Sequence, residues 1–220
     1  MSTARRLRAA TLALAGTALV AACASGPLPP DWRLNAKSAL EGYEAAYLRG
    51  NAGIAELEFA RARAELARTG RADQVAFAEL LRCALRTASL EFDECPGFAA
   101  IAQDAGASAR AYAAYLAGHW RGLDVSLLPE PHRAVVARGA ASNAIGDPVS
   151  RLVAAGVLFR VGKIGPADIA AAIDVASANG WRRPLLAWLG VQESRAQAAG
   201  DRDAAAAIRR RIELVLGDKR

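Results

Sequence analysis

The apolar and polar positions of this chain do not alternate in the way that a half-buried β-strand requires. Runs of alternating Val, Ile and Thr are absent, whereas alanine, leucine and arginine, all strong helix formers, are abundant. Proline stands where a first helical turn tolerates it, as at Pro148 and Pro166. Glycine stands where a helix would stop, as at Gly50 and Gly200. The pattern predicts an all-α protein.

This punctuation divides the chain into about ten helices joined by short connections. Short connections favour antiparallel packing of neighbouring helices, so we expect a series of helical hairpins. The expected helices are 33–49, 52–69, 72–91, 97–104, 107–118, 131–143, 148–162, 166–179, 182–199 and 202–216.

One short segment recurs within this series. The sequence AAYLRGN at 45–51 returns as AAYLAGH at 113–119, an offset of 68 residues and twice the 34-residue period of tetratricopeptide repeats. Ala55, Phe59 and Ala62 then form the small–large–small spacing with which a second repeat helix packs on the first. The chain thus resembles a degenerate tetratricopeptide-like array. Other glycine spacings, such as 44 and 38 residues between Gly118, Gly162 and Gly200, depart from the period, so an irregular helical bundle is the alternative.

The N-terminus has a different character from the rest. MSTARRLR carries three arginines and no acid, and about 14 apolar or small residues follow it. A membrane-spanning helix needs about 20 apolar residues, so this run is too short to cross a bilayer. A basic start, a short apolar stretch and small residues at its end predict a secretory signal.

The end of that segment, Val20-Ala21-Ala22-Cys23, resembles the lipobox of bacterial lipoprotein precursors. The resemblance implies that Cys23 receives a diacylglyceryl group, that residues 1–22 are removed, and that the new N-terminus is acylated by a fatty acid such as palmitate. Several buried acyl chains, at about 0.8 kcal/mol per CH₂, anchor a protein stably. By the enterobacterial sorting rule, Ala24 favours the outer membrane, and we expect the domain to face the periplasm.

The expected organisation is therefore a signal peptide at 1–22, a lipidated N-terminus and proline-rich tether at 23–32, and a helical domain at 33–220. Without residues 1–22, 198 of the 220 residues remain, a length that suits one domain or two. The net charge of +6 falls to +3 when the three signal arginines are removed. Charges of both signs are interspersed, so the composition gives no indication of nucleic-acid binding.

Two cysteines remain when Cys23 is set aside. Cys83 and Cys95 form an even pair in an oxidising compartment, which predicts a disulfide bond. The chain has no C-x-x-C pattern and no histidine near either cysteine, so we expect no metal site; a pair of free buried thiols is the alternative.

Candidate catalytic residues are sparse. The chain lacks the common nucleotide-binding, nucleophile-elbow and zinc-protease motifs, and we expect no cofactor. Its two histidines, His119 and His132, have Asp, Ser or Glu nearby but no partner that specifies a triad. The acidic run of Glu91, Asp93 and Glu94 suits a solvated turn as well as a glycan-cleaving pair.

Four tyrosines are the best candidates for binding. Tyr43 and Tyr47 are four residues apart and Tyr112 and Tyr115 three apart, so each pair shares a helix face. In helical arrays such faces line a concave groove, and tyrosine is favoured at interfaces because it joins a large apolar area to a polar tip. The alternative is that these rings fill the core between helices.

These observations favour a non-enzymatic, membrane-anchored lipoprotein that binds an envelope protein or peptide and serves in assembly or scaffolding. The bilayer is the second expected partner, through acylated Cys23. A cell-wall hydrolase with a carboxylate or histidine site, and a carrier of lipid or another small ligand, are the alternatives. The sequence specifies neither the partner nor the oligomeric state.

Overall fold

The fold is seen in a computed structural model that describes residues 29–139 and 144–217, and within these ranges it contains α-helices and one short 3₁₀ helix but no strand. The predicted signal, the lipobox and Cys23 lie outside the described residues. The helices are α1 (Asp31–Arg49), α2 (Ala52–Ala67), α3 (Ala72–Ala88), α4 (Pro96–Ala99), α5 (Ala107–Leu116), η1 (Val125–Leu127), α6 (Glu130–Arg138), α7 (Pro148–Arg160), α8 (Pro166–Ala178), α9 (Arg182–Ala198) and α10 (Arg202–Leu216). The all-α prediction is confirmed.

Most helix starts agree with the sequence pattern, and two of them carry an aspartate cap. The Asp147 side chain accepts a hydrogen bond from the Ser150 N–H at the start of α7, and Asp201 does the same for Ala204 at the start of α10. The ends differ more. The helix expected over 97–104 stops at Ala99, and α3 stops at Ala88, three residues before its expected end.

The recurring AAYL segment has a local explanation in these helix ends. Gly50 and Gly118 both adopt a left-handed backbone with φ of +86° and +77°. In each case the N–H of the next residue donates to a carbonyl five residues earlier, from Asn51 to Ala46 and from His119 to Ala114. The repeated letters therefore encode the same helix termination, with a buried tyrosine and leucine in the last turn.

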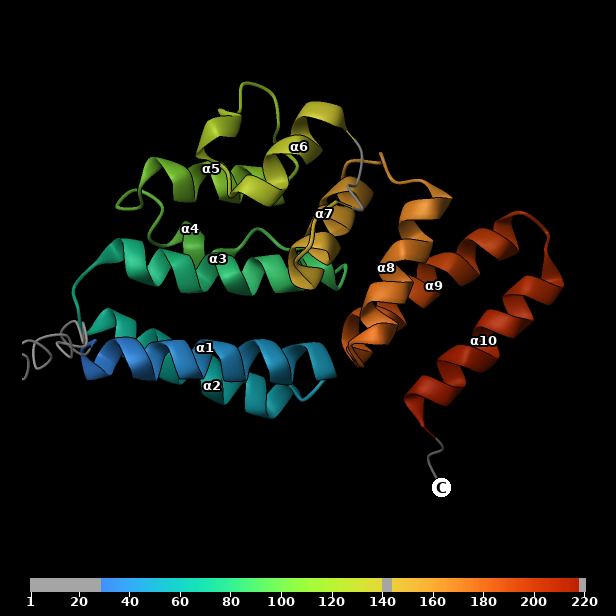
Figure 1. The fold of residues 1–220 in the computed structure, drawn as a ribbon, viewed down its shortest axis with the longest axis horizontal. Coiled ribbons are helices and arrows are strands. Elements are labelled where there is room, and N and C mark those ends of the chain that lie inside the picture. Colours follow the sequence, from blue (N-terminus) through green and yellow to red (C-terminus); the bar gives the residue numbers. More distant parts are fainter. Residues whose placement is uncertain (1–28, 140–143, 218–220) are drawn as a thin grey trace, which may run out of the picture. The chain divides into compact units, whose positions relative to one another are not determined.

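Helix α3 lies at the centre of the arrangement (Figure 1). It contacts α1 and α2 on one side and α5 and α7 on the other, and the short α4 packs on it as well. Helices α7, α8, α9 and α10 follow one another in space as in sequence, and α9 also contacts α1. None of the helices in the described ranges is long and apolar enough to cross a membrane.

Small residues let α3 and α7 approach closely. A β-carbon at Gly156 would collide with the carbonyl of Thr87, so only glycine fits there. Beside this contact the fully buried Trp188 of α9 donates its indole N–H to the Ala88 carbonyl at 3.1 Å. This bond satisfies a carbonyl at the end of α3 and fixes α9 against the central helix.

Candidate functional site

The structure corrects the predicted tyrosine surface. Tyr43 and Tyr115 are 0% exposed and Tyr47 is 6% exposed, so these three side chains are unavailable to a partner. Only Tyr112 remains partly exposed. Three of the four predicted partner-binding residues therefore belong to the core, and the alternative that the rings fill the space between helices is the correct one for them.

Each buried tyrosine is covered by a neighbouring ring. Tyr43 lies 5.1 Å from Phe59 of α2 and 5.7 Å from Tyr47, measured between ring centroids. Tyr115 stacks on Trp120 at 6.1 Å and its hydroxyl forms a 3.1 Å hydrogen bond with Nδ1 of His132. Burial raises the pKa of all three phenols above the ordinary value.

Two hollows beside α3 share two lining residues, and we call them together the α3 groove. The α1 hollow, of about 330 Å³, is lined chiefly by Trp32, Ala36, Leu40 and Leu66. The α5 hollow, of about 640 Å³, is lined chiefly by Leu80, Ala84, Ala109, Tyr112, Leu128 and His132. Phe77 and Leu81, one turn apart on α3, line both hollows and separate them.

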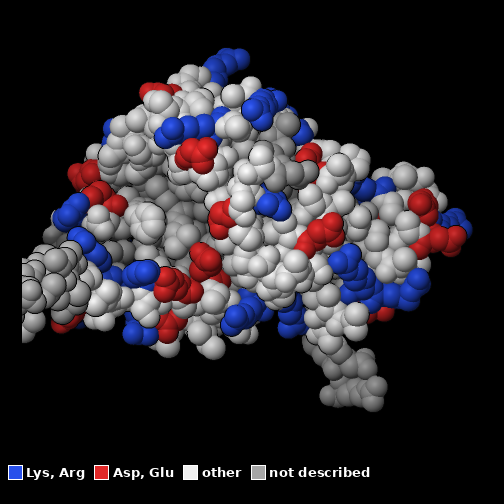
Figure 2. All heavy atoms as spheres, in the orientation of Figure 1, with Lys and Arg blue, Asp and Glu red and all other residues white. Residues whose placement is uncertain are grey.

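The α3 groove is apolar and open. Phe77 is 60% exposed, although aromatic side chains of this size are usually covered in a folded domain. Figure 2 shows a hollow between the region of α5 and α6 and the region of α1, with acidic side chains in red and basic side chains in blue around it. A surface depression with an exposed aromatic ridge is typical of a place where another molecule docks.

Charged residues also line the groove. Lys37 pairs with Glu41 at 3.7 Å, and Arg71 pairs with Asp73 at 2.8 Å. Glu44 also lines the α1 hollow; burial, and then the negative charges of Asp147 and Glu41, raise the pKa of its carboxyl. Arg33 and Lys37 line the α1 hollow as well, so the groove combines an apolar floor with charges of both signs.

His132 lies at the inner wall of the α5 hollow and does not form a catalytic arrangement. It is 2% exposed, and burial lowers its pKa to about 4. Its Nδ1 partner is the Tyr115 hydroxyl, so the neighbouring Glu130 of the sequence does not orient the ring. The neutral ring serves to satisfy a buried phenol beside Tyr112, whose ring centroid lies 5.6 Å away.

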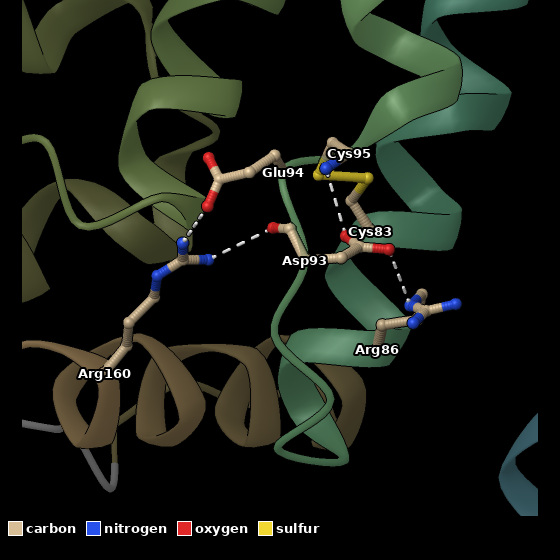
Figure 3. The surroundings of a disulfide bond; sticks show 6 residues. All are labelled: Cys83, Arg86, Asp93, Glu94, Cys95 and Arg160. Carbon is tan, nitrogen blue, oxygen red and sulfur yellow. Dashed lines mark hydrogen bonds and ion pairs between the residues drawn. A yellow bond between two sulfur atoms is a disulfide. The ribbon is translucent and has the colours of Figure 1, made fainter.

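The structure joins Cys83 and Cys95 by a disulfide bond, as predicted (Figure 3). Their Cα atoms are 5.7 Å apart, and the bond ties α3 to the start of α4. Asp93 accepts from the Cys95 N–H at 3.0 Å and forms an ion pair with Arg86. A carboxylate oxygen of Asp93 and the two sulfur atoms lie within 4.8 Å of one another, but all three groups are engaged in these bonds.

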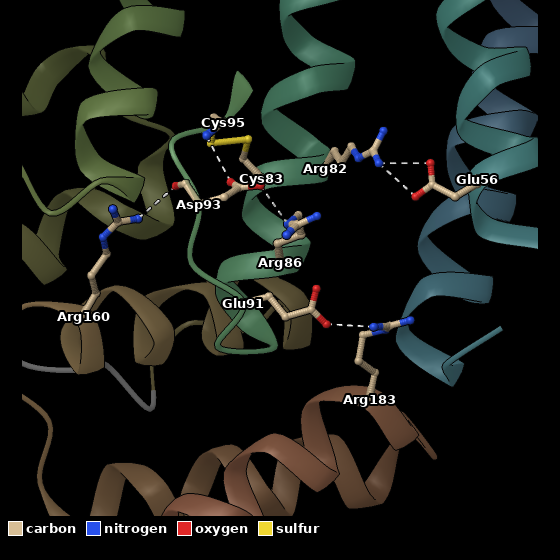
Figure 4. A network of polar contacts seen from close by, with 9 residues as sticks. All are labelled: Glu56, Arg82, Cys83, Arg86, Glu91, Asp93, Cys95, Arg160 and Arg183. Atoms are coloured by element: carbon tan, nitrogen blue, oxygen red, sulfur yellow. Dashed lines mark hydrogen bonds and ion pairs between the residues drawn. A yellow bond between two sulfur atoms is a disulfide. The ribbon is translucent and has the colours of Figure 1, made fainter. Parts of the chain in front are cut away.

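The acidic turn after α3 connects helices instead of forming a catalytic pair. Glu91 pairs with Arg183 of α9 at 2.7 Å (Figure 4). Glu94 pairs with Arg160 of α7 at 3.3 Å (Figure 3). His119 shares a small hollow of about 190 Å³ with Asp93 and Glu94. Because each of these carboxylates is held by an arginine, the hollow offers no free acid–base pair.

Comparison with known proteins found no relative from which the function of the site could be inferred. A scan against models of protein families, a search of curated proteins and a search of solved structures all give no match. The functional argument therefore rests on this chain's own residues.

Sequence reasoning missed the α3 groove and its ridge residue Phe77. One signal was present in the sequence of α3. This helix has apolar residues on nearly all of its sides, and Phe77 is one more large apolar residue among them. A helix that is apolar all round is expected in a core. The exposure of Phe77 arises because α1 and α5 flank it without covering it.

Proposed function

We propose that the protein is a membrane-anchored lipoprotein whose periplasmic helical domain binds a partner protein in the α3 groove and has no enzymatic activity of its own. The observation that carries the binding proposal is the 60% exposure of Phe77 between two apolar hollows. Removing such a ring from water stabilises a complex by about 1.5–3 kcal/mol. The resemblance of residues 20–23 to a lipobox supports the anchor at the outer membrane.

We also propose that the helices form a tetratricopeptide-like array. It is supported by the close packing of α1 on α2, and of α9 on both α8 and α10, each pair joined by a short turn. In arrays of this kind, concave surfaces bind extended segments or helices of other proteins. An envelope-assembly or scaffolding role would use the α3 groove in that way.

The test is affinity purification after crosslinking in cells, with the full precursor so that Cys23 is processed normally. We expect one or two proteins in stoichiometric amounts from the wild type, and their loss from Phe77→Ala. Ile54→Ala is the matched control, because Ile54 is 56% exposed on α2 and lines neither hollow. Cys23→Ser should release the protein from membranes.

Three results would contradict the proposal in whole or in part. A protein recovered without partners would leave the groove without a role in binding proteins, and the carrier and hydrolase alternatives would become the better accounts. A partner that stays bound to Phe77→Ala would place the interaction on a different surface. A membrane fraction unchanged by Cys23→Ser would contradict the anchor alone.

A further inference from the structure

The α5 hollow contains a ring nitrogen that no described residue uses. His132 is 2% exposed, and its Nδ1 atom is bonded to the Tyr115 hydroxyl at 3.1 Å. Its Nε2 atom makes no hydrogen bond with a described residue, yet it is not sealed in the core. Because His132 lines the α5 hollow, Nε2 opens into that hollow. Polar atoms of such buried side chains nearly always have a partner, so a ligand atom or a water molecule is required here.

The hydrogen bond to Tyr115 makes this nitrogen a donor. The Tyr115 side chain is 0% exposed, and Nδ1 of His132 is the one partner of its hydroxyl among the described residues. If Nδ1 carried a proton, the single hydrogen of the buried hydroxyl would have no acceptor. Nδ1 therefore accepts, and the proton of the neutral ring lies on Nε2. Burial lowers the pKa of His132 to about 4, so the ring stays neutral at pH 7.

The size and the walls of the α5 hollow suit a small molecule. Its volume of about 640 Å³ lies within the range of about 300–1,000 Å³ that is usual for small-molecule sites. Leu80, Ala84 and Leu128 give it an apolar floor. Tyr112 stands beside the donor, with ring centroids 5.6 Å apart, and its hydroxyl has no hydrogen-bond partner among the described residues. The polar groups are thus few and close together, as in sites that orient a mostly apolar ligand.

The charges of the α5 hollow favour an uncharged ligand. No lysine or arginine is among the described residues that line it, so an anion would find no opposite charge. Asp73 is the acidic residue of the lining, and it already pairs with Arg71 at 2.8 Å. A charged ligand would lose its hydration here without gaining a partner. A pure hydrocarbon would leave the Nε2–H of His132 unpaired.

We infer that the α5 hollow binds a neutral, mostly apolar small molecule, and that a carbonyl oxygen or another uncharged acceptor of this ligand takes the hydrogen bond from Nε2 of His132. The inference goes beyond the proposed function, because it gives this hollow a ligand of its own. The two are compatible, since Phe77 also lines the α1 hollow and a partner protein can contact it from that side.

Benzophenone is the probe for this inference. It is a neutral diaryl ketone that forms a bond to a nearby C–H group under ultraviolet light. The full chain is labelled in lipid nanodiscs, and mass spectrometry of its peptides locates the adduct. Three competitors of similar size that do not react under the same light are then compared: phenyl benzoate has an ester carbonyl, diphenylmethane has no acceptor, and diphenylacetate is an anion.

We expect adducts on peptides that line the α5 hollow, such as those containing Leu80 or Leu128. Phenyl benzoate should suppress this labelling at about one tenth of the concentration that diphenylmethane or diphenylacetate requires, the factor expected of one hydrogen bond. His132→Phe combined with Tyr115→Phe removes the donor together with the phenol that depends on it, and should abolish the preference over diphenylmethane. Tyr47→Phe is the matched control, because it alters a buried tyrosine outside the hollow and should keep the preference.

Nitrogen NMR of the wild type gives a second measurement that needs no substitution. The chain has two histidines, and His119 lines a different hollow. The Nε2–H signal of His132 should move when phenyl benzoate is added and stay in place with diphenylmethane, while the signals of His119 stay in place with both. A His132 signal that responds to neither compound would overturn the inference even if the double variant fails to fold.

The other outcomes separate this inference from the proposed function. It is overturned if benzophenone labels only other surfaces, if phenyl benzoate and diphenylmethane compete equally, or if diphenylacetate competes best. A preference for phenyl benzoate that survives His132→Phe with Tyr115→Phe would also overturn it. None of these results affects the proposed function, which is tested by the loss of a partner protein from Phe77→Ala.

Discussion

The contact between Glu79 and Gly97 shows how a buried side chain can require glycine at a neighbouring position. Glu79 of α3 is 5% exposed, and its carboxylate accepts a hydrogen bond from Arg63 at 2.8 Å. A buried carboxylate needs such a partner because losing its hydration is unfavourable. The same carboxylate lies against Gly97, and a β-carbon there would collide with it.

Gly97→Ala should therefore lower the free energy of unfolding by about 1–3 kcal/mol, because the added methyl group displaces the Glu79 carboxylate from its place beside Arg63. Gly53→Ala is the matched control. Gly53 lies in α2 with open space around it, and alanine there should stabilise the helix by about 0.5–1 kcal/mol. Denaturant titration of both variants measures the difference, and equal effects would contradict the account of Gly97.

His132 should make the protein less stable in mild acid. Burial lowers its folded-state pKa to about 4, below the ordinary value of 6.5, so the unfolded chain binds the proton first. The stability gained from the neutral ring is complete above pH 6.5 and is lost as the pH falls towards 4, by about 2–3 kcal/mol. His132→Gln should remove this part of the pH dependence. The measurement is the free energy of unfolding of both proteins at pH 7, 5 and 4. If this free energy depends on pH in the same way in the wild type and in His132→Gln, the role of His132 is contradicted.

The tyrosines mark the limit of residue-scale prediction. Their spacing predicted that Tyr43 and Tyr47 share a helix face, and their ring contact confirms it. Whether that face meets solvent or another helix depends on packing partners that the local sequence does not specify. Here Phe59 of α2 covers Tyr43, so a face suited to binding is used in the core.

At the scale of elements, the segment between α3 and α4 holds three helices together. The disulfide closes it, and Glu91, Asp93 and Glu94 extend from it to Arg183, Arg86 and Arg160 on α9, α3 and α7. Each of these ion pairs is partly exposed and contributes modestly by itself. The disulfide raises their combined contribution because it limits the conformations of the connecting chain.

Replacing Cys83 and Cys95 together by alanine should lower the free energy of unfolding by about 2–3 kcal/mol, the loss expected for a loop with a sequence separation of 12. The measurement is denaturant unfolding with and without a thiol reductant. Reductant should destabilise the wild type to about the level of the double variant and leave the variant unchanged. If the free energy of unfolding of the wild type stays the same after its disulfide has been fully reduced, the disulfide does not stabilise the fold.

Helix positions were the most predictable elements because their signals are local. Proline, glycine and capping side chains act within one turn, so the starts of most helices agree with the sequence. The end of α3 was missed because Leu90, and not glycine, adopts the left-handed conformation with φ of +59°. Helix η1 was missed because a three-residue turn capped by Asp124 has no periodic pattern.

At the scale of the whole molecule, the α3 groove arises from segments far apart in the sequence. Residues of α1, α3, α5 and α6 line it, together with Leu66 of α2 and Ser150 of α7. No local pattern predicts that α1 and α5 leave Phe77 open between them. The candidate site could therefore be found only from the structure, whereas the proposed anchor at Cys23 rests only on the sequence.

The central claim is that the α3 groove is the surface on which a partner docks, and site-specific photocrosslinking in cells tests it most directly. A benzophenone amino acid is placed at position 77 in one strain and at position 54 in another, two sites with similar exposure. We predict a discrete, light-dependent adduct from position 77 and none from position 54. Adducts of the same mass from both positions, or from position 54 alone, would contradict the claim.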